Sequence, residues 1–343
     1  MSKVKVGIVG LGWVSTGHMQ AFKANPNVEI VAVCSRRDWP QEELERIYGP
    51  GVKLYKDYSA FLDHPGLQMV DICTEHRLHP DQTVEAAEKG KHLMIEKPLS
   101  LDFASLERMR SAIEKNGVKS TVCFELRFIP HFKLIHSLLR DNLIGDVHYI
   151  EVDYYHGIGP WYGLYEWHRK KAEGGSSLLT AGAHALDALL YFKGGNVQEV
   201  QAYSTRSKAK ELQGYEYDST SVSLIRFEDG TLGKCASCID ARQPYLFNIH
   251  ILGSEGSIWN NKMWSSRLEG VSADKWIELP TVMAESGDVL AHPYGPQVDD
   301  FVDAILSDRD SSLNFAEAYK THKTVFAVEE ALVSKKAVKL SSL

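Results

Sequence analysis

Short apolar segments alternate with segments of helical periodicity over the first 124 residues of the chain. The predicted strands are Val4–Val9, Val28–Cys34, Met69–Cys73, His92–Ile95 and Lys119–Cys123, and the predicted helices between them include Asp81–Lys89 and Phe103–Lys115. Because parallel strands are joined by crossover helices, this alternation predicts an α/β unit with a doubly wound parallel sheet.

The pattern changes after Phe124. Long β-like segments follow at Asp146–His156, Val197–Ser207, Ser219–Phe227, Thr231–Ile239 and Phe247–Leu252, and helices are predicted at Ser176–Phe192, Gln297–Leu306 and Phe315–Leu332. Short turns join several of these strands, which favours a largely antiparallel sheet. The chain is also long enough for about two domains, and we place the boundary between residues 124 and 125.

A glycine turn follows the first predicted strand. Gly10-Leu11-Gly12-Trp13-Val14-Ser15 has the spacing of a dinucleotide fingerprint, with serine at the third small position. The glycines allow a tight turn and the close approach of a pyrophosphate, which then meets the free N–H groups of the next helix. The motif lies between a strand and a helix, as it must to bind a dinucleotide.

The end of the second strand bears on the choice of cofactor. Ser35 occupies the position where an acidic residue binds the ribose 2′-hydroxyl of NAD, and Arg36 and Arg37 follow it. Serine and arginine accept a 2′-phosphate, whereas a carboxylate repels it. The cofactor is therefore NAD or NADP, with NADP slightly favoured, although Arg36 could equally stack on adenine and tolerate NAD.

Composition narrows the class of protein further. The net charge of −7 disfavours nonspecific nucleic-acid binding. No apolar stretch reaches the length of a membrane span and no signal sequence is evident, so we expect a cytoplasmic protein. The five cysteines suggest no disulfide framework, and the lone Cys235-Ala236-Ser237-Cys238 lacks nearby partners for zinc, so we expect free thiols and no metal site.

Two further patterns point to proton chemistry. Glu96-Lys97-Pro98 follows a predicted strand, which puts an ammonium group at the rim of the parallel sheet. An ammonium beside a bound nicotinamide can donate to a developing alkoxide. In the predicted helix Ser176–Phe192, the residues Thr180, His184, Asp187 and Tyr191 share one face. That polar stripe needs partners or a wet cleft, and His184 bonded to Asp187 is one alternative.

Together these features resemble the Gfo/Idh/MocA oxidoreductases, the glucose-fructose oxidoreductase and inositol dehydrogenase family. The resemblance rests on Gly10-Leu11-Gly12, Cys73-Thr74-Glu75-His76-Arg77-Leu78-His79, Glu96-Lys97-Pro98, Gly174-Gly175 and Gly182-Ala183-His184-Ala185-Leu186-Asp187. It implies a dinucleotide-binding Rossmann domain over residues 1–124. It further implies a substrate-binding and oligomerisation α/β domain with a large open-faced sheet over residues 125–343, and a sugar or cyclic polyol substrate.

The resemblance also implies roles for individual residues. Lys97 and His184 match the family's catalytic pair. The cofactor-binding residues expected from the motifs and the resemblance are Gly10, Gly12, Trp13, Val14, Ser35, Arg36, Arg37, Thr74, His76, His79, Glu96, Lys97 and Arg127. The expected substrate-binding residues are Lys97, Arg127, Trp161, Trp167, His168, Thr180 and His184. An ion pair is an equal alternative for Arg127, and core or interface packing is an equal alternative for the aromatic segment from Trp161 to Lys170.

The chain departs from the family pattern at two positions. Thr180 stands where many relatives carry an aspartate, and a hydroxyl cannot act as a carboxylate base near neutral pH. Glu75 stands where proline is usual. His292-Pro293-Tyr294 is a weak further candidate for the rim of the site.

The leading function is therefore an NAD(P)-dependent sugar or polyol dehydrogenase or reductase. A redox-neutral glycoside-cleaving enzyme and a non-catalytic nucleotide-sensing regulator are the alternatives, and the retained Lys97 and His184 argue against the regulator. The strands of the second domain are apolar on both faces, so we also expect a homodimer or homotetramer formed through the open sheet face.

Overall fold

The computed structural model describes residues 3–284 and 292–343. The chain forms two compact units: Met1–Glu125 with Asp288–Tyr319, and Leu126–Gly287 with Lys320–Leu343. The change at Glu125 lies one residue from the expected domain boundary. The described residues 292–319 differ from that linear division, because they pack with the first unit.

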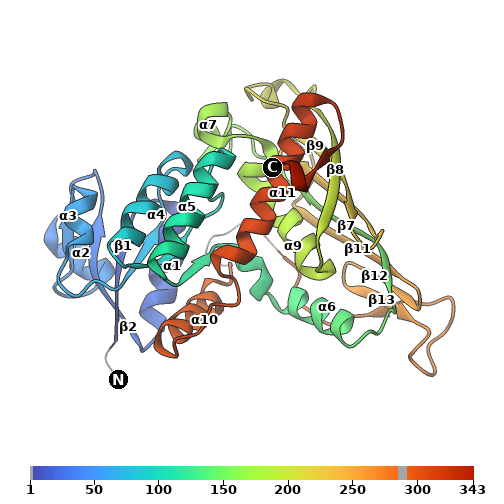
Figure 1. The fold of residues 1–343 in the computed structure, drawn as a ribbon, viewed down its shortest axis with the longest axis horizontal. Coiled ribbons are helices and arrows are strands. Elements are labelled where there is room, and N and C mark those ends of the chain that lie inside the picture. Colours follow the sequence, from blue (N-terminus) through green and yellow to red (C-terminus); the bar gives the residue numbers. More distant parts are fainter. Residues whose placement is uncertain (1–2, 285–291) are drawn as a thin grey trace. The chain divides into compact units, whose positions relative to one another are not determined.

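The first unit contains a six-stranded parallel sheet (Figure 1). Its strands are β1 (Val4–Val9), β2 (Val28–Cys34), β3 (Lys53–Tyr55), β4 (Met69–Ile72), β5 (His92–Ile95) and β6 (Ser120–Val122). The strand order β3-β2-β1-β4-β5-β6 reverses direction between β1 and β4. This is the Rossmann arrangement, in which ligands bind beyond the carboxyl ends of the strands at the point of reversal.

Helices and a late segment complete the core of this unit. The helices are α1 (Trp13–Ala24), α2 (Gln41–Tyr48), α3 (Tyr58–Leu62), α4 (His79–Glu88), α5 (Phe103–Asn116) and α10 (Tyr294–Leu306). α10 lies beside α1 (Figure 1). Val298 and Phe301 of α10 are fully buried in one cluster with Ile8 and Phe22. This apolar face explains why a segment so late in the sequence joins the first unit.

The second unit is built on a nine-stranded sheet. Its strands are β7 (Val147–Tyr155), β8 (Val197–Thr205), β9 (Thr220–Phe227), β10 (Leu232–Cys238), β11 (Leu246–Gly253), β12 (Gly256–Trp259), β13 (Lys262–Ser265), β14 (Ile277–Glu278) and β15 (Val338–Lys339). The order is β14-β13-β12-β11-β7-β10-β9-β8-β15. β7 and β10 pair in parallel and the other neighbours are antiparallel, which confirms the predicted fold class.

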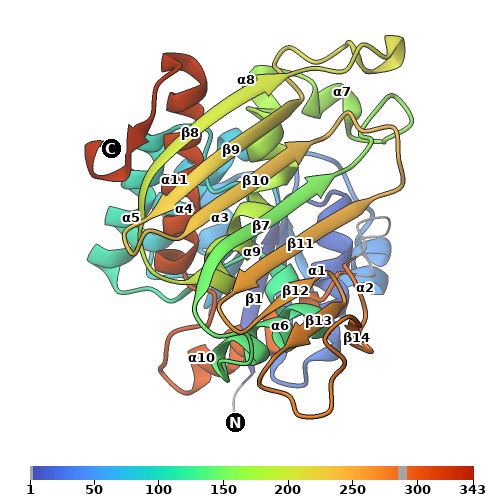
Figure 2. The same ribbon diagram turned by 90° about the vertical axis from the view of Figure 1, so that its right-hand side faces the viewer.

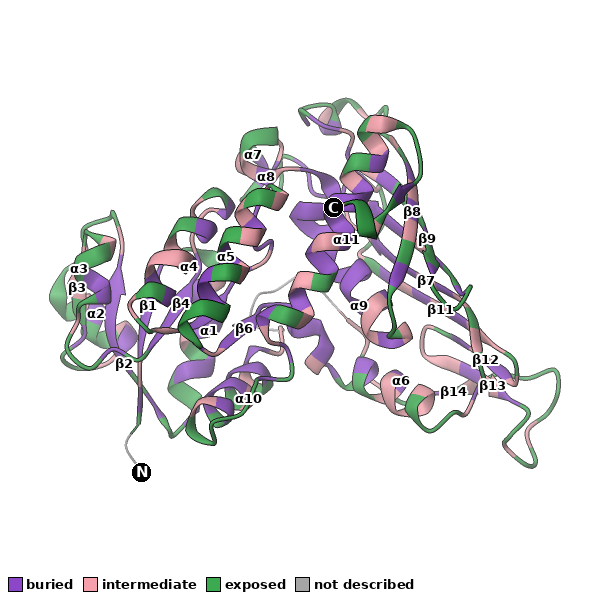
Figure 3. Cartoon of the chain, in the orientation of Figure 1, coloured by how far each residue is buried: buried purple, intermediate pink, exposed green. Residues whose placement is uncertain are grey.

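One face of this sheet is covered and the other is open. The helices of the unit are α6 (Pro130–Arg140), α7 (Tyr165–His168), α8 (Lys171–Gly174), α9 (Ala183–Lys193) and α11 (Phe315–Ser334), which carries the unit boundary. α9 packs on β7 and β10 and is almost wholly buried (Figure 3). Figure 2 shows the opposite face uncovered by helices. There Tyr203, Leu224 and Leu232 are 64%, 56% and 54% exposed.

The predicted single helix Ser176–Phe192 is wrong in its first half. Leu178–Gly182 forms a π-helical turn, and the α-helix begins at Ala183. Gly182 allows this turn to approach β10, because a Cβ atom there would lie 2.2 Å from the hydroxyl of Ser237. Within the described ranges, no helix is both long and apolar enough to cross a membrane.

Candidate active site

The loop after β1 contains two glycines with different physical requirements. Gly10 has φ +88°, and a Cβ atom there would lie 2.5 Å from the carbonyl oxygen of Cys73. At Gly12 a Cβ atom would meet no protein atom within 4 Å. α1 starts next, at Trp13, with no side-chain cap and no acidic residue in its first turn among the described residues. The open space and the free N–H groups fit the pyrophosphate of a dinucleotide.

Positively charged side chains gather at the end of β2. The hydroxyl of Ser35 accepts a hydrogen bond of 3.2 Å from the N–H of Arg37. Arg36 Nη2 lies 2.9 Å from Glu75 Oε1, and Lys56 Nζ lies 3.3 Å from the carbonyl oxygen of Arg36. Three cations thus lie beyond the end of β2, and part of their charge is offset by Glu75 and by Asp38, which lies 2.8 Å from Lys56 Nζ.

His79 connects two loops at the same edge of the sheet. Its Nδ1 lies 2.8 Å from the carbonyl oxygen of Pro98, and its Nε2 lies 3.0 Å from that of Thr74. The hydroxyl of Thr74 donates to Gln82, and the ring of His76 lies 5.8 Å from that of His79. Burial lowers the pKa of His79. The ring is fully buried and braces these loops, and cofactor binding by His79 stays a prediction.

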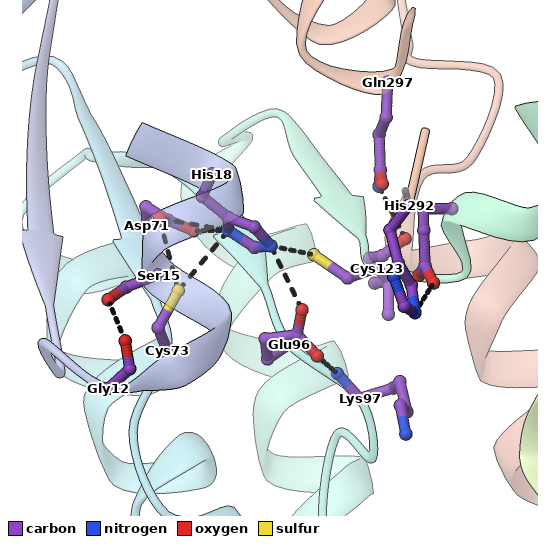
Figure 4. A network of polar contacts seen from close by, with 12 residues as sticks. Gly12, Ser15, His18, Asp71, Cys73, Glu96, Lys97, Cys123, His292 and Gln297 are labelled. Carbon is purple, nitrogen blue, oxygen red and sulfur yellow. Dashed lines mark hydrogen bonds and ion pairs between the residues drawn. The ribbon is translucent and has the colours of Figure 1, made fainter. Parts of the chain in front are cut away.

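Lys97 follows the carboxyl end of β5 (Figure 4). Its backbone N–H donates to Glu96 Oε2 at 3.1 Å, and Glu96 Oε1 lies 3.1 Å from His18 Nε2. Burial tends to raise the pKa of Glu96, but His18 and Lys97 lower it below its ordinary value. The motif residues Gly10, Thr74 and Lys97 thus follow β1, β4 and β5, and parallel strands bring them to one edge.

Glu125 is a buried acidic residue that the sequence analysis missed. Burial raises its pKa to about 7, although His292 has the opposite effect. His292 Nε2 lies 3.8 Å from Glu125 Oε1. The ring of His292 also lies 5.7 Å from Tyr294 and 6.4 Å from Trp13. The candidate His292 therefore lies beside the residue that starts α1. The available signal for Glu125 was an acidic residue that closely follows the buried strand β6.

Arg127 and Asp187 form a buried ion pair in the second unit. Arg127 donates two hydrogen bonds of 2.7 Å to the carboxylate, and Thr321 donates a third of 2.8 Å. The Arg127 guanidinium also lies 4.9 Å from the ring centre of Tyr191. This is the ion-pair alternative considered for Arg127, and direct contact with cofactor or substrate stays a prediction.

His184 begins the buried helix α9 and is 8% exposed. The hydroxyl of Thr180 donates to the carbonyl oxygen of Gly174 at 2.9 Å. It also lies 3.2 Å from the hydroxyl of Tyr217. Tyr217 donates in turn to the carbonyl oxygen of His168 at 2.6 Å. A Cβ atom at Gly174 would lie 2.2 Å from that same oxygen, so only glycine fits. Thr180 therefore braces the loop before α9.

The aromatic segment divides into a buried and an exposed part. His168 is buried, stacks 5.9 Å from Tyr162 and lies 4.7 Å from Trp167, whose indole N–H donates to Glu173. Trp161 is 63% exposed. It borders a cavity that is lined by His156, Gly157, Trp161, Ala241, Arg242, Gln243 and Tyr245. His168 and Trp167 thus have packing partners and Trp161 is exposed beside the cavity, while substrate binding by these three residues stays a prediction.

The five cysteines are free in the structure. Cys235 is buried, and Cys238 is half-buried with its pKa raised to about 11 by burial. Cys238 Sγ lies within hydrogen-bonding distance of Thr220 and Asp240. These contacts agree with free thiols in the CxxC segment.

A Rossmann sheet, an open helix N-terminus and a lysine at the same sheet edge define the class of nicotinamide-dependent oxidoreductases. Two family models match the chain: "Oxidoreductase family, NAD-binding Rossmann fold" over residues 4–124 and "GFO/IDH/MocA C-terminal domain" over residues 132–259. The chain therefore belongs to the Gfo/Idh/MocA oxidoreductase family, as the motifs predicted, and its first domain is of the NAD-binding type.

Individual relatives are similar over most of the chain. Myo-inositol 2-dehydrogenase from Thermotoga maritima is 27% identical over 256 residues, 75% of each chain. Glycosyl hydrolase family 109 protein 1 from Bacteroides thetaiotaomicron is 24% identical over 280 residues, 75% of this chain and 60% of that protein. A solved levoglucosan dehydrogenase in complex with NADH superposes with a TM-score of 0.85 at 22% identity, covering 99% of both chains. That last likeness shows the fold alone.

Proposed function

We propose that this protein is an NAD(P)-dependent dehydrogenase or reductase that acts on a ring hydroxyl or ketone of a sugar, cyclic polyol or glycoside. The observation that carries the proposal is the fixed turn around Lys97. Its N–H is bonded to Glu96, and the carbonyl oxygen of Pro98 contacts His79 at 2.8 Å. The turn lies at the sheet edge that also carries Gly10. The names of the sequence relatives, which include myo-inositol 2-dehydrogenase, support a sugar or polyol as the substrate class.

The nicotinamide, when bound, accepts or supplies the hydride. Lys97 donates a hydrogen bond to the reacting oxygen and stabilises its negative charge. His184 receives or returns the hydroxyl proton. Asp187 is engaged by Arg127 and Thr321, so it holds α9 in place rather than taking part in proton transfer.

We further propose a modest preference for NADP. Ser35 lacks the carboxylate that repels a 2′-phosphate, and Arg36, Arg37 and Lys56 supply positive charge close by. The ratio of kcat/KM for NADP to that for NAD measures this preference. A ratio well below one contradicts it.

We also propose that the protein is a homodimer or homotetramer joined through the open face of the nine-stranded sheet. Support comes from Tyr203, Leu224 and Leu232, which are large apolar side chains exposed on neighbouring strands. Large exposed apolar side chains are typical of a protein interface, and here Gln201, Arg226 and Lys234 lie among them on the same face.

The substitution Lys97→Ala tests the catalytic proposal. Loss of a positioned proton donor should lower kcat on the order of 10²- to 10⁴-fold. Cofactor affinity, measured by calorimetry, should stay within about threefold, equivalent to less than 1 kcal/mol. Lys115→Ala, at an exposed position of α5, is the matched control. Nicotinamide absorbance with a panel of sugars, polyols and glycosides gives the rate, and near-normal turnover of Lys97→Ala overturns the proposal.

Redox-neutral cleavage of a glycoside is the second candidate, and the similarity to a family 109 glycosyl hydrolase favours it. Such an enzyme releases free sugar from a glycoside with a catalytic amount of cofactor and no net change in nicotinamide absorbance. A steady change in absorbance without sugar release supports the dehydrogenase instead. Cofactor binding without either reaction would point to the regulator.

A further inference from the structure

A buried polar network in the first unit connects α1, β4 and the turn after β5. His18 lies on the buried face of α1, fully buried, between Asp71 of β4 and Glu96, which follows β5 (Figure 4). Its Nδ1 lies 3.0 and 3.1 Å from the two carboxylate oxygens of Asp71, which is also fully buried. On the other side of the ring, Nε2 lies 3.1 Å from Glu96 Oε1. One imidazole ring thus connects two buried carboxylates.

The charge of this ring follows from its surroundings. Burial tends to lower the pKa of His18, but Asp71 raises it well above its ordinary value. The other titratable groups facing the ring are the thiols of Cys73 at 3.4 Å and Cys123 at 3.9 Å, together with the ring of Tyr294 at 4.3 Å. Burial raises the pKa of all three, so these groups are neutral near pH 7. His18 then carries a positive charge between the carboxyl groups of Asp71 and Glu96.

The network ends at the turn that carries Lys97. Glu96 uses one carboxylate oxygen for His18 and the other for the backbone N–H of Lys97, at 3.1 Å. A buried carboxylate without a cation is costly, so removing the imidazolium changes both the orientation and the protonation of Glu96. His18 of α1 therefore fixes the position of the Glu96 carboxylate, which accepts the hydrogen bond from the Lys97 backbone.

We infer that His18 is a positioning residue for Lys97, holding the Glu96 carboxylate against the Lys97 N–H through a charged chain that is anchored at Asp71. The inference rests on the role proposed for Lys97. It gives α1 a second task besides the one proposed for its N-terminus, because the same helix also fixes the turn that carries the catalytic lysine.

The substitution His18→Gln tests the inference through the pH profile of kcat/KM. Without the imidazolium, Glu96 takes up a proton at a higher pH. The acidic limb of the profile, where kcat/KM falls at low pH, should therefore move to higher pH by about one unit, equivalent to about 1.4 kcal/mol. We also expect kcat to fall about 10- to 100-fold, as a displaced catalytic group does. A merely structural defect would lower activity equally at every pH.

A second variant covers the case in which His18→Gln does not fold, since that change leaves two buried carboxylates unpaired. Asp71→Asn keeps a hydrogen-bond acceptor for Nδ1 and removes only the charge, so it should move the same limb upward by a smaller amount. Cys123→Ala is the control, because it removes a neutral contact at 3.9 Å from the ring and should leave the profile unchanged.

Nuclear magnetic resonance of cofactor-free protein with ¹⁵N-labelled histidine gives a readout independent of turnover. At pH 7 the ring nitrogens of His18 should report an imidazolium in the wild type and a neutral ring in Asp71→Asn. A neutral His18 in the wild type at pH 7 overturns the inference. So does a stoichiometric metal ion that is lost in the variants, because a metal would then hold the network.

The two proposals fail in different ways. Normal turnover in Lys97→Ala removes the proposed function and this inference with it. An inactive Lys97→Ala together with unshifted profiles in His18→Gln and Asp71→Asn leaves the proposed function intact and removes only the role of His18.

Discussion

The guanidinium of Arg127 and the carboxylate of Asp187 face each other with two hydrogen bonds of equal length, 2.7 Å. Their side chains are only 8% and 3% exposed. A paired geometry of this kind is the strongest that arginine makes with a carboxylate. It ties the segment just before α6 to the middle of α9, the helix that carries His184.

Breaking this pair should destabilise the protein strongly. Arg127→Met leaves the Asp187 carboxylate buried with only Thr321 as a donor, at an expected cost of about 3 to 5 kcal/mol in the free energy of unfolding. Arg127→Lys keeps the charge but loses the paired geometry, so its cost should be smaller. Urea denaturation measures both. Arg140→Met, at an exposed ion pair with Asp141, is the control and should cost less than about 1 kcal/mol. Equal effects for the two Met variants would contradict the prediction.

The ion pair between Arg36 and Glu75 should tune the choice of cofactor. Glu75→Gln frees the Arg36 guanidinium, which is 80% exposed, for a 2′-phosphate. The kcat/KM ratio of NADP to NAD should rise about two- to fivefold, as expected for release of an exposed pair worth up to about 1 kcal/mol. Arg36→Ala should lower the same ratio, and Glu42→Gln on α2 should leave it unchanged. A fall of the ratio in Glu75→Gln would show that Arg36 plays no part in binding the phosphate.

Glu125 should make stability depend on pH. Its pKa is raised from 4.5 to about 7 in the folded protein, so between these values the folded chain holds a proton that the unfolded chain has lost. The contribution is favourable below pH 4.5, decreases as pH rises through this window and is lost above about pH 7. Glu125→Gln should therefore gain about 2 to 3 kcal/mol relative to wild type between pH 5 and pH 8. Chemical denaturation at the two pH values measures the gain. A constant difference between variant and wild type would mean that the Glu125 carboxyl titrates normally.

The open sheet face should control the oligomeric state. Leu224→Glu puts a charge on this face, opposite Gln201 and Lys234 of the neighbouring strands, and should lower the mass measured by light scattering at micromolar concentration. Val333→Glu, 78% exposed on α11, changes an apolar side chain away from that face and serves as the control. A wild-type monomer, or an unchanged mass in Leu224→Glu, would rule out an interface at this position.

The features predicted well from the sequence depend on neighbouring residues. Gly10-Leu11-Gly12 and Glu96-Lys97-Pro98 are contiguous motifs. The alternation of apolar runs with helical segments correctly predicted a doubly wound parallel sheet for the first unit. Such signals arise from local backbone geometry and from strand burial on both faces, so no knowledge of distant contacts is needed.

The features that were missed depend on contacts between residues far apart in the chain. His18 contacts Asp71, which lies 53 residues later in the chain. Glu125 lies near His292, which belongs to a segment that returns to the first unit after most of the second unit. A buried histidine or glutamate in the sequence does not reveal its partner. Ser15, His18 and Phe22 share the buried face of α1, which was a signal that His18 needed one.

The polar face predicted for the helix Ser176–Phe192 shows a different limit of prediction from sequence. It assumed uniform α-helical periodicity from Ser176 to Phe192, but the π-helical turn Leu178–Gly182 shifts Thr180 out of that register. Thr180 binds the carbonyl oxygen of Gly174 instead. Periodicity alone does not distinguish a π turn from an α-helix, because the turn is stabilised by packing against β10.

The parallel pairing of β7 with β10 has a consequence for synthesis of the chain. β7 ends at Tyr155, yet its two neighbours in the sheet, β10 and β11, are complete only at Cys238 and Gly253. At typical elongation rates of about 5 to 20 residues per second, the central strand of the second unit waits roughly 5 to 20 seconds for both partners. β8 and β9, which adjoin each other in the chain and in the sheet, can pair earlier. A ribosome that stalls before Gly253 therefore leaves β7 with at least one unpaired edge, and chaperone binding is most needed during this interval.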